Sequence, residues 1–397
     1  MTHTTVKMKA RQDRRVRSGH PWVFSNELDC DVSALPSGGL VTLTTANGKF
    51  IGHGYANPKS LIAIRLLSRN RSADIATSAF FASRLRHAVA LRASLYPGRT
   101  AYRLVNAESD GLPGLIIDRF NDVLSVQITT LGMDHLKNPL KEAIVEVLQP
   151  KGAVFRNDSP MRTLEGLPTE KGIWFGTIPD FIDIDEFGVT FRVHVLGGQK
   201  TGHFFDQADN RHFAGKLCNN MKVLDVYSNS GGWGLHALKH GASEVIFVDK
   251  QEPCCEQIEA NVALNGFEDR AVILCDEGKK TLETLLSNGV RFDAVNLDPP
   301  AFAKQRRAAN SALKGYREIN RLGLLLVKPG GFLFTSSCSY HVHEERFLEA
   351  IQKAAEDAGR SIRVVRRGEQ SADHPTRPEV PETRYLKSYA FQVMPEW

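Results

Sequence analysis

The sequence predicts an α/β protein in which a doubly wound parallel sheet follows two smaller domains. The first observation is the length of 397 residues, which exceeds that of an ordinary single domain. The second is the regular alternation of strand-like and helical stretches in the C-terminal half. The third is a series of short apolar runs separated by turn residues near the N-terminus. We therefore expect a small β-barrel domain over residues 1–74, a central α+β domain over 75–192 and the doubly wound domain over 193–397.

The net positive charge of the chain lies in the N-terminal region. Residues 1–75 hold 11 Lys and Arg against 5 Asp and Glu, whereas the formal charge of the whole chain is +5. Positive surfaces attract phosphate backbones through counterion release, although such charges also form ordinary solvated faces. We expect Arg14, Arg15 and Arg17 to contact phosphates. In the same region Asn47–Gly48 predicts a two-residue hairpin turn with positive φ at both residues.

The central region mixes helical and strand-like stretches. A helix is predicted over 79–95, because apolar residues recur at helical spacing and Pro97–Gly98 follows as a stop. A second helix is predicted near 136–148, among several strand-like runs. Residues 187–193 predict another hairpin. This mixture indicates an α+β domain.

Composition excludes several classes of protein. Hydrophobic residues make up 42% and charged residues 24%, which is typical of a globular chain and not of a disordered one. No apolar run is long enough to span a membrane, and the charged start does not resemble a signal peptide. We expect a soluble, unsecreted, cytoplasmic protein without membrane contact.

The six cysteines include no CxxC pair, so neither a disulfide framework nor a metal site is predicted. Most cysteines in proteins are small buried core residues. We expect that role for five of them, namely Cys30, Cys218, Cys254, Cys255 and Cys275.

Acidic residues accompany four successive strands of the predicted sheet: Asp225, Asp249, Asp276 and Asp298. Ligands of open α/β sheets bind beyond the carboxyl ends of the strands. Residues 227–234, which follow the first strand, contain three glycines that allow close approach of a ligand. Asp249 lies about 20 residues beyond this turn, where a carboxylate commonly binds the two hydroxyls of a ribose. Any single aspartate could be a helix cap, and Asp225 could act only by organising the turn.

The type of cofactor follows from what this turn lacks. Neither a GxGxxG nor a GxxxxGK[ST] motif is present, which disfavours dinucleotides and P-loop triphosphates. S-adenosylmethionine has a ribose and an adenine but no phosphate. It is therefore the nucleoside cofactor that best matches carboxylates around this turn.

A reacting group is predicted at the ends of the next strands. Asp298-Pro299-Pro300 places a carboxylate and a rigid turn there, and Cys338 follows the buried run 332–337. Carbon 5 of a pyrimidine becomes nucleophilic only after a thiolate has attacked carbon 6, so its methylation requires a cysteine. A base within a helix must also be flipped out. We expect Cys338 to be the nucleophile and Asp298 to hold the pyrimidine edge and assist at nitrogen 3.

Several motifs spread over nearly the whole chain carry a resemblance to a known family. They are Ser18-Gly19-His20-Pro21-Trp22-Val23-Phe24, Asn57-Pro58, residues 110–115, residues 199–207, Asp298-Pro299-Pro300, Gly315-Tyr316, Ser337-Cys338-Ser339 and residues 372–375. On these motifs the chain resembles the RlmI-type family of ribosomal RNA large-subunit cytosine-5 methyltransferases.

The resemblance implies a PUA domain, a central α+β domain and a class I (Rossmann-like) methyltransferase domain. It also implies large-subunit ribosomal RNA as substrate, Cys338 as nucleophile and a homodimer. The cofactor-binding residues expected are Asp225, Tyr227, Ser228, Gly231, Gly232, Asp249, Lys250, Asp276, Asp298 and Gln207. The substrate-binding residues expected are Arg14, Arg15, Arg17, Pro299, Pro300 and Tyr316.

The chain departs from the family pattern at two places. The family usually has Asp-Gln-Arg where this chain has Asp206-Gln207-Ala208, and Arg211 is near enough in the sequence to substitute for the missing arginine. The family turn is often Ser-Tyr-Thr-Gly-Gly-Phe, where residues 228–233 here read Ser-Asn-Ser-Gly-Gly-Trp.

Two other functions stay open. One is a guanine-N7 or amino-directed RNA methyltransferase, which would not need Cys338. The other is a non-enzymatic RNA-binding protein, which would not need the carboxylates around the Gly-rich turn.

Overall fold

The computed structural model describes residues 3–198, 202–303 and 305–395. The chain forms two compact units, of which the first comprises Met1–Ile184, Val193–Phe205 and Ala372–Thr383. The second comprises Asp185–Arg192, Asp206–Ser371 and Arg384–Trp397. Residues 372–383 thus belong to the first unit, although the segments on both sides of them belong to the second. The expected domain boundaries at residues 74 and 192 stay predictions.

The N-terminal part of the first unit is a five-stranded sheet with the order β1-β3-β4-β5-β2. Its apolar core includes Val23, Val41 and Ile64, each fully buried. Its strands are β1 (Thr4–Lys7), β2 (Trp22–Phe24), β3 (Leu40–Thr44), β4 (Phe50–Ala56) and β5 (Ile62–Ser68), with the short helix α1 (Arg14–Arg17) between the first two.

The hairpin between β3 and β4 is confirmed, but its turn differs from the predicted one. The strands pair antiparallel, and Gly48 has a φ of 78°. Asn47 does not adopt positive φ. The Thr45 N–H donates to the Lys49 carbonyl at 2.8 Å, so the loop is longer than two residues and needs only one left-handed position. The prediction of positive φ at both residues was therefore wrong.

The remainder of the first unit contains a second five-stranded sheet, of order β10-β9-β8-β7-β6, packed against α2 and α4. The predicted helix over 79–95 is confirmed as α2, whose first turn is capped by the Thr77 hydroxyl accepting from the Phe80 N–H. The elements are α2 (Ser78–Leu95), β6 (Ala101–Asn106), β7 (Leu115–Phe120), β8 (Val123–Ile128), α3 (Leu131–His135), α4 (Lys137–Leu148), β9 (Gly152–Asn157), α5 (Pro160–Leu164) and β10 (Glu170–Gly176).

A hairpin is present near the range predicted for it, 187–193, but it begins earlier in the chain, because its strands are β11 (Ile182–Glu186) and β12 (Val189–Val193). Its two turn residues, Phe187 and Gly188, have φ of 53° and 81°. Two consecutive left-handed residues form the tight turn that matches the twist of the flanking strands.

The second unit is a seven-stranded sheet with the order β15-β14-β13-β16-β17-β19-β18. The first five strands in this order are parallel, and β19 is antiparallel to both of its neighbours. The strands are β13 (Lys222–Val226), β14 (Glu244–Asp249), β15 (Ala271–Cys275), β16 (Phe292–Leu297), β17 (Val327–Ser337), β18 (Ile362–Gly368) and β19 (Lys387–Val393).

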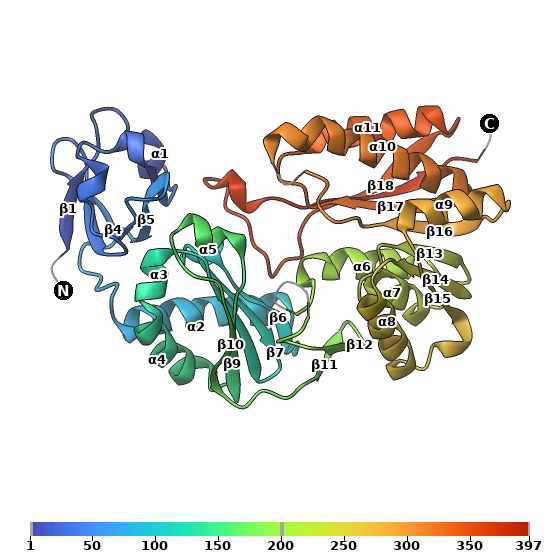
Figure 1. Ribbon diagram of the computed structural model, residues 1–397, viewed down its shortest axis with the longest axis horizontal. Helices are drawn as coiled ribbons and strands as arrows, with labels where there is room; N and C mark the ends of the chain where they lie inside the picture. Colours follow the sequence, from blue (N-terminus) through green and yellow to red (C-terminus); the bar gives the residue numbers. More distant parts are fainter. Residues whose placement is uncertain (1–2, 199–201, 304, 396–397) are drawn as a thin grey trace. The chain divides into compact units, whose positions relative to one another are not determined.

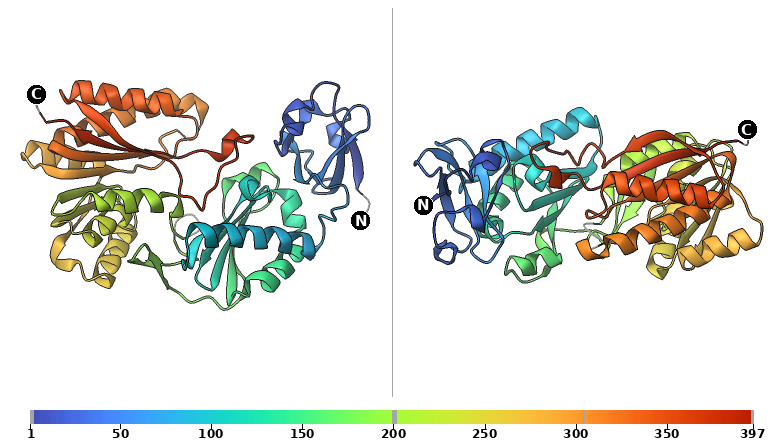
Figure 2. Two further views of the ribbon diagram at one scale, coloured as in Figure 1. Left: turned by 180° about the vertical axis from the view of Figure 1, so that it is seen from behind. Right: turned by 90° about the horizontal axis from the view of Figure 1, so that it is seen from above.

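Helices cover both faces of this sheet, as Figures 1 and 2 show. Leu282, Tyr316 and Phe347 come from the three helices of one face and join the large apolar core against the strands. That face carries α9 (Gly278–Ser287), α10 (Ala309–Leu326) and α11 (Glu344–Asp357), and the other carries α6 (Ala208–Lys216), α7 (Gly232–Lys239) and α8 (Glu252–Leu264). The predicted doubly wound sheet is therefore confirmed.

Only three of the five cysteines that were expected to be buried are buried. Cys218, Cys254 and Cys255 are buried, as expected, but Cys30 and Cys275 are exposed. The prediction was wrong for these two because Cys30 lies in a loop and Cys275 ends the edge strand β15. Among the described residues, no helix is both long and apolar enough to cross a bilayer.

Candidate active site

The order of the strands changes direction between β13 and β16. These neighbouring parallel strands connect onward in opposite directions, toward β14 and toward β17. A ligand site is expected beyond the carboxyl ends at such a switch point. The four predicted aspartates lie at or just beyond the ends of the parallel strands β13 to β16.

Asp225 organises the turn after β13. Its side chain is fully buried, with one oxygen accepting from the Gly234 N–H at 3.0 Å and the other from the Asn296 amide at 2.8 Å. Burial raises the pKa of Asp225 to about 6. These contacts hold Asp225 inside the protein, where it shapes the turn, and its expected contact with the cofactor stays a prediction.

The turn itself has an unusual backbone. Tyr227, Asn229 and Gly231 have φ of 65°, 54° and 83°, which places three residues of this short segment in the left-handed region. The Ser228 hydroxyl donates to the Asp225 carbonyl at 2.7 Å and accepts from the Val248 N–H at 3.0 Å. Ser228 therefore fastens the turn to β14, and Gly232 then begins α7.

Asp249 ends β14 and faces this turn. One of its oxygens accepts from the Asn229 N–H at 3.0 Å and the other from the Gln251 N–H at 3.1 Å. A carboxylate has about four acceptor sites, so both oxygens retain capacity for a diol. The neighbouring Lys250 is exposed.

Asp276 has a more solvated position than Asp249. Its side chain is 44% exposed and forms an ion pair with Lys280 at 3.1 Å. Hydrogen bonds from the Glu277 N–H and from Lys280 lower the pKa of Asp276. The structure thus places Asp276 at the rim of the predicted cofactor site.

Asp298 is held by two donors from the starts of different helices. The Gln207 amide lies 3.1 and 3.2 Å from its two oxygens, and the Trp233 indole N–H donates to one oxygen at 3.1 Å. Of the two following prolines, Pro299 is buried and Pro300 is exposed. Trp233 was not among the predicted site residues, because nothing in its sequence position shows that its indole reaches Asp298.

Cys338 directly follows β17 and is partly buried. The Tyr316 hydroxyl lies 3.0 Å from the hydroxyl oxygens of both Ser337 and Ser339, the two neighbours of Cys338. Tyr316 was expected to bind substrate, but its side chain is fully buried. It positions the end of β17 instead.

The loop after Asp298 is joined to the Cys338 segment. The Ala303 N–H donates to the Ser339 hydroxyl at 3.2 Å. Leu297 also pairs with Thr335 in the parallel ladder of β16 and β17. The predicted nucleophile and the predicted pyrimidine-binding carboxylate therefore follow paired strands at one edge of the sheet.

Lys387 is a site residue that sequence reasoning missed. It pairs with Ser337 in the antiparallel ladder, and its ammonium donates to the carbonyls of Ser339 and Tyr385 at 2.7 and 2.9 Å. Burial lowers the pKa of Lys387 to about 8, while the nearby Cys338 acts in the opposite direction. A buried cation thus lies beside the thiol, and no local motif around residue 387 indicates it.

Arg211, which could substitute for the missing family arginine, is paired with a buried carboxylate. Its guanidinium donates to both carboxylate oxygens of Glu186, at 2.9 and 2.8 Å. Ala208 is fully buried. Of the motif over residues 199–207, Gln199, Lys200 and Thr201 lie outside the described residues.

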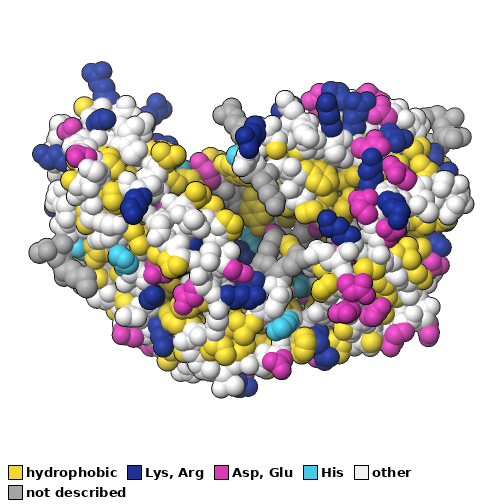
Figure 3. All heavy atoms as spheres, in the orientation of Figure 1, with side chains coloured by type: hydrophobic (Ala, Val, Ile, Leu, Met, Phe, Trp, Pro, Cys, Tyr) yellow, Lys and Arg dark blue, Asp and Glu magenta, His cyan; other side chains and the backbone are white. Residues whose placement is uncertain are grey.

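The three N-terminal arginines differ in how exposed they are. Arg15 forms an ion pair with Glu27 at 2.8 Å, Arg17 lies 3.6 Å from Asp13, and Arg14 is exposed. In Figure 3 the Lys and Arg side chains of the N-terminal lobe are spread over the visible face. Arg14 and Arg17 are thus the members of the predicted phosphate contacts with the freest side chains.

The sheet order and the acidic, Gly-rich carboxyl edge define the class I methyltransferase fold. Two solved structures share it over almost the whole chain. One is a provisionally assigned S-adenosylmethionine-dependent methyltransferase from Streptococcus mutans, with a TM-score of 0.82, 18% identity, and coverage of 98% of this chain and 100% of that one. The other is a provisionally assigned methyltransferase in complex with SAH, with a TM-score of 0.84 and 18% identity over 99% and 100% of the chains.

Sequence comparison identifies the family. A PUA-like domain model matches residues 6–69, and a model described as conserved hypothetical protein 95 matches residues 202–334. The ribosomal RNA large subunit methyltransferase I of Vibrio vulnificus is 38% identical over 99% of this chain and 100% of its own. The protein of the same name from Vibrio cholerae is 37% identical over the same shares. The chain belongs to the family of these methyltransferases.

Proposed function

We propose that this protein transfers a methyl group from S-adenosylmethionine to carbon 5 of a cytosine in large-subunit ribosomal RNA, through a covalent bond to Cys338. The names of its relatives support methyl transfer and the RNA substrate, and the complex of a structural neighbour with SAH supports the cofactor class. The observation that carries the cytosine-5 chemistry is Cys338 beside the buried Lys387, at the same sheet edge as Asp298.

The residues at the switch point fit this cofactor. The side chains there are carboxylates and amides, which can hydrogen-bond the hydroxyls of a ribose and the amino group of an amino acid. A Cβ at Gly278 would lie 2.9 Å from the Tyr227 ring, so the loops after β13 and β15 approach closely only with glycine there. We assign the ribose to Asp249 and the adenine side to Asp276.

S-adenosylmethionine would supply an electrophilic methyl group at this edge. The Cys338 sulfur attacks carbon 6 of the cytosine, and the new S–C6 bond shifts an electron pair onto carbon 5, which takes the methyl group and leaves S-adenosylhomocysteine. Transfer of the proton from carbon 5 to water then restores the C5–C6 double bond and expels the thiolate. Asp298, oriented by Gln207 and Trp233, holds the pyrimidine edge at nitrogen 3.

The attack requires the thiolate form of Cys338. A neighbouring cation lowers the pKa of a thiol because it stabilises the negative charge. Lys387 provides that cation, and the two backbone carbonyls fix its position. Tyr316 holds Ser337 and Ser339, so the sulfur between them is presented in one orientation.

A trapping experiment tests this function. An RNA transcript of the large subunit with 5-fluorocytidine in place of cytidine should form a denaturation-resistant adduct, since fluorine at carbon 5 blocks the final proton loss. Cys338→Ala should form no adduct and lose turnover by about 10³-fold or more, while still binding S-adenosylmethionine. Cys30→Ala is the matched control, because its thiol is exposed in the first unit, outside the unit that holds Asp298 and Cys338, and should not affect trapping.

Methylation by Cys338→Ala at near wild-type rate would refute the covalent route. It would favour the guanine-N7 or amino-directed reaction, neither of which uses a thiolate. Binding of RNA without any methyl transfer by the wild-type protein would instead favour the non-enzymatic alternative.

A further inference from the structure

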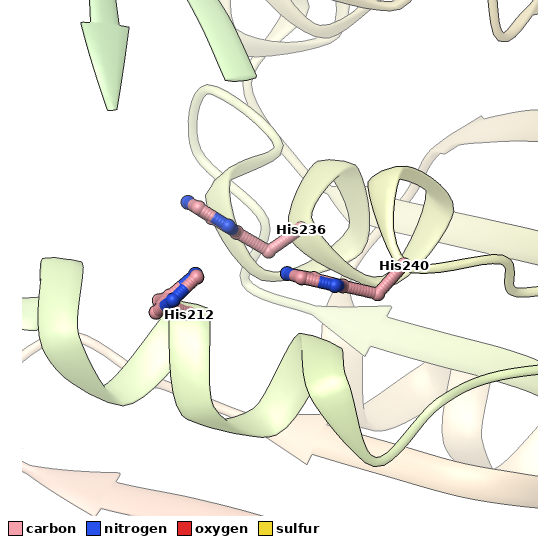
Figure 4. Close-up of side chains that lie close together, drawn as sticks. All are labelled: His212, His236 and His240. Atoms are coloured by element: carbon pink, nitrogen blue, oxygen red, sulfur yellow. The ribbon is translucent and has the colours of Figure 1, made fainter. Parts of the chain in front are cut away.

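Three histidines of the second unit gather on the facing sides of α6 and α7, away from the residues assigned to methyl transfer. They are His212 on α6, His236 on α7, and His240, which directly follows α7 as its C-cap (Figure 4). One ring nitrogen of each lies within 4.8 Å of the corresponding nitrogens of the other two. His236 and His240 are four residues apart, which places them on one face of the helix.

Glycine at position 215 brings the two helices together. A Cβ there would lie 2.6 Å from the His236 carbonyl oxygen and 3.0 Å from the His240 ring. Such distances require a shift of the backbone, so only glycine permits this approach. His212 lies one turn before Gly215 and therefore shares its face toward α7.

The three imidazoles have nitrogen atoms that lack protein partners. Nδ1 of His212, Nδ1 of His236 and Nε2 of His240 are buried without a hydrogen bond. His236 is the decisive member, because its side chain is completely buried. Buried polar atoms are nearly always hydrogen-bonded, so three such nitrogens in one cluster indicate a ligand.

The other nitrogen of His236 has the partner that a metal-bound imidazole needs. His236 Nε2 lies 3.1 Å from a Glu186 carboxylate oxygen, to which its N–H donates. That hydrogen bond assigns the lone pair to Nδ1, on the side of the other histidines. Arg211 holds the same carboxylate with two hydrogen bonds, so the acceptor is fixed in place.

We propose that His212, His236 and His240 bind a divalent transition-metal ion such as Zn²⁺, with Glu186 supporting the ligand His236. Three imidazole nitrogens without a carboxylate ligand favour Zn²⁺, Co²⁺ or Ni²⁺ over Mg²⁺ or Ca²⁺. Tetrahedral ligands at about 2.0–2.1 Å from zinc lie roughly 3.4 Å apart, so modest side-chain rotations close the site. A fourth ligand would be water.

The electrostatic surroundings are compatible with this ion. Burial lowers the pKa of His212 to about 4 and also lowers the pKa of His236 and His240, so the imidazoles are neutral ligands. Lys216 and Lys239 oppose a cation, but both are exposed and their side chains reach solvent. The buried Arg211 also opposes a cation near His236, and its partner Glu186 offsets the charge of Arg211.

The metal would join two helices that begin at the methyl-transfer site. Gln207 immediately precedes α6 and Trp233 lies in the first turn of α7, and both donate to Asp298. The histidine cluster lies farther along the same helices. The ion would therefore stabilise the pairing of α6 with α7 without taking part in methyl transfer.

The test uses full-length protein stripped of metal with a chelator. Titration with Co²⁺ should give the visible absorption bands of a four-coordinate nitrogen site at one equivalent, and Zn²⁺ should displace them. Titration calorimetry with Zn²⁺ should show the same single site, and Zn²⁺ should raise the Tm because it binds the folded state.

His212→Gln combined with His240→Gln should weaken Zn²⁺ binding by 100-fold or more and abolish the rise in Tm. Both side chains are only partly buried, and glutamine retains hydrogen-bonding capacity, so the fold should survive. His87→Gln, at an exposed position of α2, is the matched control and should bind as the wild type does. Binding to a cysteine would persist in the double variant. Equal affinities of the wild type and the double variant, or no binding by the wild type, would overturn the proposal.

Discussion

The first unit and the region around Cys338 hold their buried cations in different ways. In the first, Arg65 is 7% exposed and lies 2.8 Å from the buried Glu165. Arg92, fully buried, forms an ion pair with Asp110 at 2.5 Å. In the second, Lys387 is also 7% exposed, yet its ammonium donates to two backbone carbonyls.

This difference separates a structural cation from one placed for chemistry. In a buried ion pair the attraction between the charges offsets part of their desolvation cost, and removing one partner is strongly destabilising. A buried cation without a carboxylate carries its desolvation cost without that offset. Such groups with shifted pKa values are typical of functional sites. The comparison predicts that Arg65 controls stability and that Lys387 controls reactivity.

The largest expected effect tests whether Arg65 controls the stability of the protein. Arg65→Met should lower the free energy of unfolding by about 3–5 kcal/mol, because Glu165 would remain buried without its cation. Urea denaturation followed by circular dichroism measures this decrease. Adding Glu165→Leu to the same variant should restore much of the stability, since the orphaned charge is then gone. A decrease in the free energy of unfolding below about 1 kcal/mol for Arg65→Met would mean that Arg65 does not control stability.

The second prediction asks whether an aspartate at the sheet edge binds cofactor. Asp249→Ala should weaken S-adenosylmethionine binding by about tenfold or more, since losing hydrogen bonds to a charged acceptor costs roughly 1.5–3 kcal/mol. Asp276→Asn should have a smaller effect, because that side chain is 44% exposed and already paired with Lys280. Calorimetry measures both affinities. Unchanged affinity in a folded Asp249→Ala variant would remove Asp249 from the site.

The third prediction tests whether Lys387 controls the reactivity of Cys338. Lys387→Met should raise the pKa of the Cys338 thiol and move the rising limb of the kcat pH profile to higher pH. Each unit of that shift lowers activity on the limb about tenfold. Stability at pH 7 should not fall, in contrast to Arg65→Met. Lys353→Met, on the surface of α11, is the control. A parallel decrease in stability with an unchanged pH profile would make Lys387 structural.

The same lysine should also affect how stability depends on pH. The pKa of Lys387 is about 8 in the folded protein, whereas an ordinary lysine, as in the unfolded chain, has a pKa of 10.5. Between these two pH values the unfolded chain therefore binds more protons than the folded protein. The free energy of unfolding contributed by Lys387 therefore rises as the pH increases from about 8 toward 10.5. Chemical denaturation at several pH values should show that rise in the wild type and its absence in Lys387→Met.

The smallest expected effect concerns the N-terminal arginines. Arg14→Ala combined with Arg17→Ala should make the salt dependence of RNA binding less steep, by a slope of about one for each arginine that binds a phosphate in the wild type. Cofactor affinity should not change. Arg15→Ala should instead destabilise the protein, because Arg15 is paired with Glu27. A wild-type salt slope in the double variant would mean that these charges only face solvent.

Much of the second unit's sheet could be predicted because its inner strands are continuous apolar runs. Val245 and Val248, for example, lie in a run buried on both sides, which is typical of parallel strands covered by helices. The edge strand β18 was missed, because residues 362–368 contain three arginines and are largely exposed. Backbone pairing with β19, not an apolar pattern, forms that strand. The strands β6 and β10 escaped prediction as well.

The sequence by itself determined the carboxyl edge of the sheet. Aspartates that follow successive parallel strands must meet at one edge, so local patterning placed Asp249 and Asp298 together and predicted Cys338 beside them.

Only the tertiary structure decided the pairs that join distant parts of the chain. Lys387 reaches the Cys338 segment through the register of an antiparallel ladder, Ser337 opposite Lys387, and no local spacing encodes that register. His212 meets His236 and His240 because two helices approach at Gly215. Such contacts depend on how elements pack, since side chains far apart in sequence become neighbours only when the surfaces between them are buried.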